Sequence, residues 1–135
     1  MKDDEFRPLS GNENRILERL FEVKFMGRDA LAQQLTGLLA KPLDENGSLA
    51  LRSTTPRAAD VKGGAIVEAS YPVKDCGEAY PIVVHIILHV KKGRLSILEI
   101  YRDDSLRVAE PVDPNKFVLF SAAEIPEPSK SDPQP

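Results

Sequence analysis

Apolar positions near the start of the chain recur at the spacing of an amphipathic helix. Ser10 and Glu13 have the spacing of a capping box, in which each residue satisfies a free backbone N–H group at a helix start. The apolar residues that follow lie three and four positions apart: Ile16, Leu17, Leu20, Phe21 and Phe25. The pattern predicts a helix that stops at Gly27 and a shorter helix from Asp29 to Thr36, ended by Gly37. Together these predict an αα-hairpin with one apolar face to bury.

Beyond residue 37 the pattern changes to that of β-strands. Strands are expected over residues 38–43, 48–52, 65–73, 81–90, 95–102 and 116–120. Asn46-Gly47 predicts a hairpin between the first two, because both residues tolerate positive φ. The polar segment from Arg52 to Gly64 is expected to be a mobile surface loop.

These elements predict an α+β fold: an N-terminal αα-hairpin packed on a mainly antiparallel, meander-like sheet of five or six strands. A single domain is expected over residues 10–120. A polar lead-in covers residues 1–9, and the proline-rich segment 121–135 is expected to be a disordered tail.

The central hairpin, from Pro81 to Arg102, begins with a strand that is apolar on both faces. One face consists of Ile82, Val84, Ile86, Leu88 and Val90, and the other of Val83, His85, Ile87 and His89. Two short helices cover one face of such a sheet, so the second face needs the loop, the tail or another subunit. The pattern therefore predicts an interface with another protein, or with a second copy of this chain, through Val83, His85, Ile87 and His89.

The composition of this 135-residue chain limits the classes of partner that it is expected to bind. Its formal net charge is -3, which argues against the dense basic surface that nucleic acids require. Nucleic-acid binding stays an alternative only if these basic residues gather on one side: Arg52, Arg57, Lys62, Lys91, Lys92 and Arg94. No apolar run is long enough for a membrane span, and Met1–Ser10 does not resemble a signal peptide. A cytoplasmic protein without membrane contact is expected.

The candidate chemistry centres on His85, His89 and Glu99. A three-residue turn at Gly93 would place His85 opposite Glu99, with His89 about 13 Å along the strand. A two-residue turn would shift that register. Because both histidines must reach one centre to bind zinc, metal ligation is not favoured, and no cofactor is expected. A small enzyme or ligand-binding domain with a pocket of His85, Glu99 and Tyr101 beside the loop at 52–64 is the alternative function.

The single cysteine, Cys76, lies in a turn after Asp75. No basic residue adjoins it to lower the pKa of the thiol, so a passive thiol is predicted rather than a nucleophile.

Three segments of the chain resemble a small bacterial family known as a domain of unknown function. They are FRPLSGNENRILERLF near the start, DENGSLAL at residues 44–51, and VVHIILHVKKGRLSILEIYRDD across the central hairpin. The resemblance spans Phe6 to Phe120 and implies a bacterial, stand-alone domain, but it transfers no catalytic residue. The favoured function is a non-enzymatic protein-binding module, of the kind seen in toxin-neutralising immunity proteins and small regulatory partners.

Overall fold

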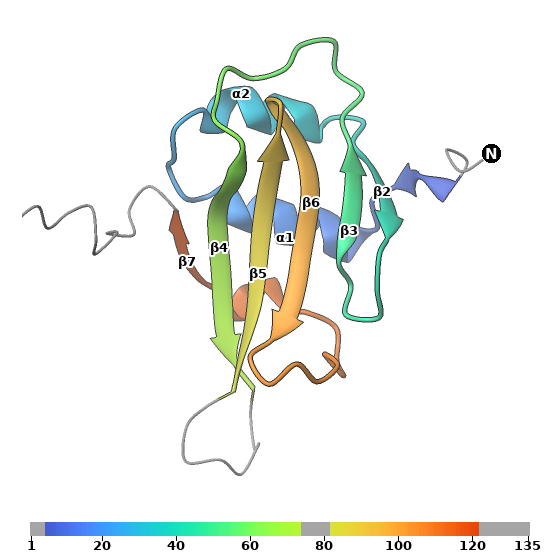
Figure 1. The fold of residues 1–135 in the computed structure, drawn as a ribbon, viewed down its shortest axis with the longest axis vertical. Coiled ribbons are helices and arrows are strands. Elements are labelled where there is room, and N and C mark those ends of the chain that lie inside the picture. The colour runs from blue at the N-terminus through green and yellow to red at the C-terminus, as the bar shows by residue number, and fades with distance from the viewer. Residues whose placement is uncertain (1–4, 74–81, 122–135) are drawn as a thin grey trace, which may run out of the picture.

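Seven strands form one antiparallel sheet, and the helices pack against one of its faces (Figure 1). The computed structural model describes residues 5–73 and 82–121. The strand order across the sheet is β1-β2-β3-β6-β5-β4-β7. The strands are β1 (Arg7–Pro8), β2 (Leu39–Pro42), β3 (Leu49–Arg52), β4 (Gly64–Pro72), β5 (Val83–Lys91), β6 (Arg94–Arg102) and β7 (Val118–Ser121). The helices are α1 (Gly11–Leu20) and α2 (Arg28–Ala32), with 3-10 helices at Gln33–Leu35 and Pro114–Lys116.

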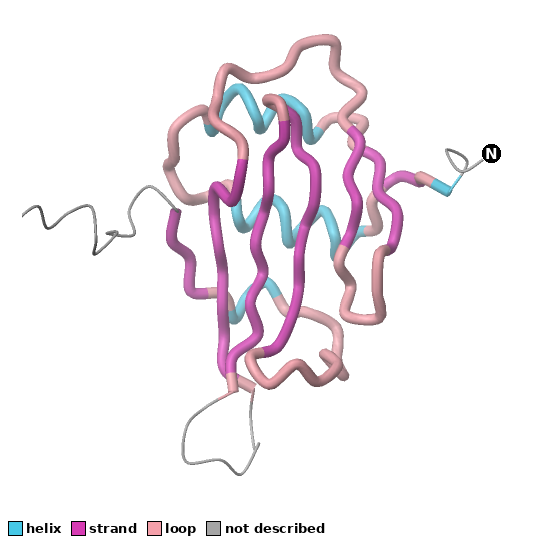
Figure 2. Tube along the Cα trace, viewed as in Figure 1, coloured by secondary structure: helices cyan, strands magenta, loops and turns pink. Residues whose placement is uncertain are grey.

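Two groups of consecutive strands build the sheet (Figure 2). β1, β2 and β3 form one meander and β4, β5 and β6 form another; they join where Leu49 and Ala50 of β3 pair with β6. β7 returns to the sheet edge beside β4. The predicted α+β class with an antiparallel sheet is confirmed. The strand count is seven rather than five or six, because Arg7–Pro8, within the predicted lead-in, pairs with β2 as a short edge strand.

The predicted αα-hairpin is wrong. α1 ends at Leu20, and Gly27 lies outside it with a φ of 82°, a conformation that a right-handed helix does not contain. α2 has only five residues before the chain tightens into the 3-10 helix. The two elements are therefore separate short helices on the same face of the sheet, and their buried leucines are Leu17, Leu20 and Leu31.

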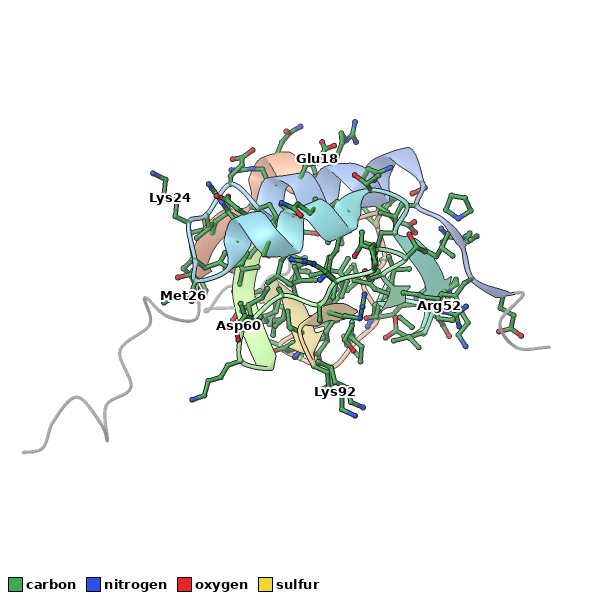
Figure 3. All side chains as sticks on the ribbon, turned by 90° about the horizontal axis from the view of Figure 1, so that it is seen from above. Glu18, Lys24, Met26, Arg52, Asp60 and Lys92 are labelled. Atoms are coloured by element: carbon green, nitrogen blue, oxygen red, sulfur yellow. The ribbon has the colours of Figure 1, made fainter. Side chains whose placement is uncertain are left out.

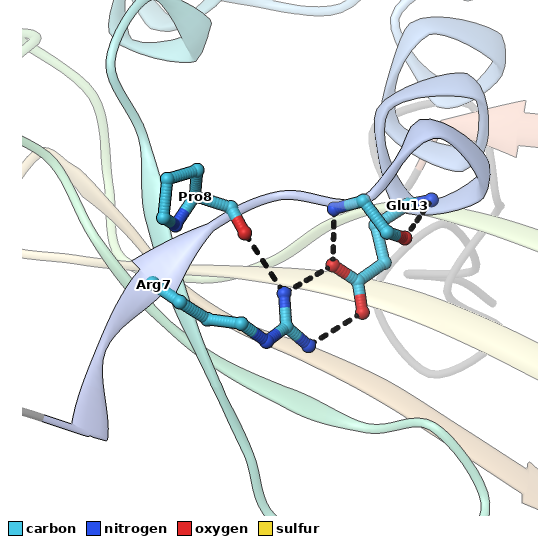
Figure 4. Close-up of polar contacts among 4 residues, drawn as sticks. Arg7, Pro8 and Glu13 are labelled. Carbon is cyan, nitrogen blue, oxygen red and sulfur yellow. Dashed lines mark hydrogen bonds and ion pairs between the residues drawn. The ribbon is translucent and has the colours of Figure 1, made fainter.

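The start of α1 is fixed by the predicted capping box together with a cation from β1 (Figure 4). The Glu13 N–H donates to Ser10 Oγ at 3.2 Å, and the Ser10 N–H donates to Glu13 Oε1 at 2.8 Å. The Arg7 guanidinium donates one hydrogen bond to each carboxylate oxygen of Glu13, at 2.8 and 2.9 Å. It also donates to the Pro8 carbonyl oxygen. The hydrogen bond from Arg7 is the main cause that lowers the pKa of Glu13. This ion pair ties the edge strand β1 to the helix layer.

The side chains of β5 divide between the two faces of the sheet. Val84, Ile86, Leu88 and Val90 are buried beneath the helices, whereas Val83, His85, Ile87 and His89 are only partly buried on the other face. The structure thus places the two predicted sets on opposite faces. Pro81 and the tail segment 122–135 lie outside the described residues.

Buried hydrogen bonds hold the turn between β5 and β6. Gln34, which is 1% exposed, donates from Nε2 to the Gly93 carbonyl oxygen and accepts from the Leu95 N–H, both at 2.9 Å. The Ala59 N–H also donates to the Gly93 carbonyl oxygen, at 2.8 Å. Arg94 donates to the carbonyl oxygens of Thr55 and Pro56. These bonds connect the predicted loop to the hairpin and fix the position of its strands.

Candidate functional site

The sheet face opposite the helices, named here the open face, carries His85, His89 and Tyr101 of the central strands. Figure 3 shows both helices on one side of the sheet, with Glu18 pointing away from it. Residues directly opposite in paired strands share a face, so the register assigns its members. In the three central strands they are Ala65, Glu68, Ser70, Pro72, Val83, His85, Ile87, His89, Lys91, Arg94, Ile97, Glu99 and Tyr101.

His85 lies between two carboxylates at the centre of the open face. Its Nδ1 is 2.8 Å from Glu68 Oε2, and its Nε2 is 2.5 Å from Asp103 Oδ1. Because ionised carboxylates only accept hydrogen bonds, both contacts form when the imidazole carries both protons. Burial is the largest influence and lowers the pKa of His85. The hydrogen bonds and charges of Glu68 and Asp103 together outweigh it and raise the pKa above the ordinary value. The geometry is that of an imidazolium held by two acids.

Tyr101 stacks on this imidazole. The two ring centroids are 4.8 Å apart with an interplanar angle of 16°, which suits a cation–π contact when His85 is charged. Tyr101 remains 36% exposed. Burial raises the pKa of its phenol, and the charges of Glu68, Glu99 and Asp103 raise it further. The aromatic ring therefore lies in the field of three carboxylates.

Glu99 lies opposite Ile87, not opposite His85. The hairpin turn consists of Lys92 and Gly93, with φ of 54° and 77°, so the register predicted from a three-residue turn is wrong. Glu99 instead approaches its diagonal neighbour: its Oε1 lies 3.0 Å from His89 Nε2.

The residues proposed for an enzyme pocket therefore fall into two groups. His85 stacks with Tyr101 and binds Glu68 and Asp103, whereas Glu99 binds His89. A proton acceptor or donor role for His85 requires that one of its two carboxylate contacts first break.

The hollow beside Glu99 leaves out the group of His85. A hollow lined in part by His89, Ile97 and Glu99 does not include His85 or Tyr101 in its walls. In residues 5–73 and 82–121, no three His, Cys, Asp or Glu side chains are placed to hold a metal ion.

Sequence reasoning missed Glu68 and Asp103, the two acids that hold His85. Glu68 lies in the predicted strand at 65–73, but its contact with His85 follows from the register between β4 and β5, which the connecting residues do not reveal. Asp103 has the character of a turn-forming acid after a strand. Its N–H donates to the Val83 carbonyl oxygen at 3.0 Å, which brings its side chain back over β5.

The basic residues of the nucleic-acid alternative come from the end of β3, the loop at 53–63 and the β5–β6 hairpin. The loop and hairpin meet through the bond between Ala59 and Gly93, so several of these cations lie near one end of the sheet. Arg94 uses its guanidinium to hold the loop, and Arg52 stacks on Phe6 with its Cζ 4.0 Å from the ring centroid. Two of these cations are thus engaged within the chain. Cys76 lies outside the described residues.

Comparisons of the chain with protein-family models, with curated proteins and with solved structures each gave no match. The family resemblance of the sequence therefore stays a prediction. No helix in the part of the chain that the structure describes has the length and apolar character needed to cross a membrane.

Proposed function

We propose that this chain is a non-enzymatic, cytoplasmic protein-binding module that engages another protein through its open face. The observation that carries the proposal is the exposure of apolar and aromatic surface there. Six large apolar residues are exposed in the described part of the chain, and three of them, Ile97, Tyr101 and Val118, lie on the open face. Val118 shares that face because it pairs with Ser70 of β4.

The composition of the open face supports recognition of a protein. Protein interfaces are enriched in Tyr, and the open face exposes Tyr101 together with Ile97 of the same strand. The hydrogen bonds of His85 and His89 to strand or loop neighbours hold the polar side chains of the open face in place before a partner binds. Such preorganisation lowers the entropy lost on association.

A binding role also fits these contacts better than the alternative enzyme role. Joint acid–base catalysis by His85 and Glu99 needs both groups to reach one bound substrate. Their separate partners, Asp103 and His89, direct them apart.

The test is affinity capture with the full chain, identification of the bound protein, and measurement of binding with that protein purified. Ile97→Lys places a cation on the open face, and we expect it to weaken binding at least tenfold by desolvating an unpaired charge. Met26→Lys is the matched control: Met26 is 82% exposed and lies in the connection between α1 and α2. We expect Met26→Lys to bind normally.

The two variants also separate the competing surfaces. Both must first unfold in urea at the same midpoint as the unmodified chain. A purified partner that binds Ile97→Lys as tightly as the unmodified chain contradicts docking on the open face. Loss of binding in Met26→Lys alone would instead locate the partner at the hollow of Phe25, Met26 and Val61.

A further inference from the structure

We infer that the open face recognises arginine side chains of a basic partner protein, with Tyr101 as the stacking platform and Glu99 and Asp103 beside it as the anionic acceptors. This inference rests on the proposed function and names the chemistry of the partner. It follows from the order of charges along the strands.

The first step is the spacing of residues on β6. Glu99 and Tyr101 point to the open face two residues apart, and Asp103 follows two residues beyond Tyr101. Two residues of an extended strand span about 7 Å, so the ring has an acid on each side at about that distance. The Asp103 and Glu99 side chains are each 46% exposed, so both reach solvent.

The second step is the local excess of negative charge. Glu68, Glu99 and Asp103 contribute three carboxylates to this region, whereas one proton on His85 compensates for only one of them. The cations Lys41 and Arg52 lie over Phe6 at the β1 side of the sheet, away from this group. Lys91, which follows His89 on the same face of β5, and Arg94 opposite it lie at the turn end of these strands. The acidic strip of the open face is therefore the surface around Tyr101.

The third step is the choice of ligand. His85 covers one side of the Tyr101 ring, and the remaining 36% of this residue's surface is accessible. A guanidinium stacks on aromatic rings and pairs with carboxylates through two parallel N–H groups, whereas an ammonium is a strongly hydrated point charge. An aromatic ring between two carboxylates thus matches arginine better than lysine.

A second copy of this chain fits the strip less well. In a two-fold dimer the same patch meets itself, which would bring Glu68, Glu99 and Asp103 toward the same acids of the other copy. Like charges that face each other across an interface oppose association. The charge pattern therefore favours a different, basic protein.

The experiment titrates the full, isotopically labelled chain with an acetylated peptide of alternating Arg and Gly, and with its Lys counterpart, while amide NMR shifts are recorded. We expect the largest shifts at Glu99, Tyr101 and their neighbours in β5, and tighter binding of the Arg peptide by about threefold, the size of one exposed cation–π contact. Light scattering at low and high salt in the same samples shows whether the chain instead associates with itself.

Single variants separate specific recognition from general attraction by net charge. Tyr101→Leu and Glu99→Gln are each expected to weaken the Arg peptide about two- to fivefold, the range of one exposed pair. Both leave the contacts of His85 with Glu68 and Asp103 in place. Glu18→Gln is the matched control, because it removes the same charge from the outer side of α1 (Figure 3). Equal weakening by Glu18→Gln and Glu99→Gln, or shifts centred on the helices, would overturn the inference.

The purified natural partner distinguishes this inference from the proposed function. A partner whose binding is lost in Ile97→Lys but unchanged in Glu99→Gln and Tyr101→Leu docks on the open face without arginine recognition. In that case the inference fails and the proposed function stands. A partner unaffected by all three variants contradicts both.

Discussion

Replacement of Gln34 by methionine tests how the hairpin that carries His85 and Tyr101 is held. Gln34→Met keeps the length of the side chain but removes its donor to Gly93 and its acceptor for Leu95. Gly93 retains the N–H of Ala59, whereas the Leu95 N–H loses the amide oxygen in a site where Gln34 is 1% exposed.

Two lost hydrogen bonds cost about 1 kcal/mol each, and one unsatisfied buried donor adds about 1–3 kcal/mol. The greater apolarity of methionine offsets part of this, so we expect the free energy of unfolding to fall by about 2–4 kcal/mol. In urea, where the slope is about 1–3 kcal/mol per molar, the midpoint should fall by roughly 1–2 M.

The assay is equilibrium unfolding in urea, with hydrogen exchange of the Leu95 amide as a local measurement. Gln33→Met, at the exposed neighbouring position, is the matched control and should change the free energy of unfolding by less than about 0.5 kcal/mol. If Gln34→Met unfolds at the midpoint of Gln33→Met, or if the Leu95 amide exchanges as slowly as before, the account of Gln34 as a buried partner of the turn is wrong.

Three further outcomes follow from the structure. The pKa of His85 is raised in the folded state, so its contribution to stability is complete below pH 6.5 and is lost as pH rises through the folded pKa. The difference in free energy of unfolding between the unmodified chain and His85→Gln should therefore shrink from pH 6 to pH 9. A constant difference would contradict the ion pairs of His85. In thermal melts, Gly93→Ala should destabilise the fold by more than about 2 kcal/mol, because Gly93 has a φ of 77° and a Cβ there would lie 2.2 Å from the Ala59 carbonyl oxygen. Gly11→Ala is the control: a Cβ at Gly11 meets nothing within 4 Å, so this variant should be neutral or more stable. Ser48→Ala removes a buried hydroxyl that bonds both backbone groups of one residue in β6, and calorimetry should show a loss of about 1–3 kcal/mol; an unchanged melting temperature would argue against that bridge.

Local patterns along the chain predicted the elements that depend on local chemistry. The capping box of Ser10 and Glu13 and the turn at Asn46-Gly47 are present, and Gly47 adopts a φ of 100°. The alternation along β5 correctly separated the buried set from the open-face set, because strand side chains alternate between faces with a period of two.

Features that depend on contacts between residues far apart in the sequence could not be predicted from local patterns. The apolar period from Ile16 to Phe25 suggested a longer helix, yet the chain leaves the helix at Leu20 and packs Phe21 against Phe25, with ring centroids 5.6 Å apart, in the connection. The register of the central hairpin depends on the length of its turn and on an irregularity between His89 and Val90, and the hydrophobic pattern shows neither of them. The contact between Glu68 and His85 depends on the register between β4 and β5, which spacing within either strand does not reveal.

The division of the sheet into two meanders has a consequence for the order of folding and for how the protein can evolve. The strands β4, β5 and β6 are consecutive, so their pairing closes short loops, whereas pairing of Leu49 with Leu98 closes a longer loop at a higher entropy cost. Glu68, His85 and Tyr101 all belong to this locally closed unit. Substitutions in β1 and β2 can therefore accumulate and change stability while the open face over β4, β5 and β6 keeps its geometry.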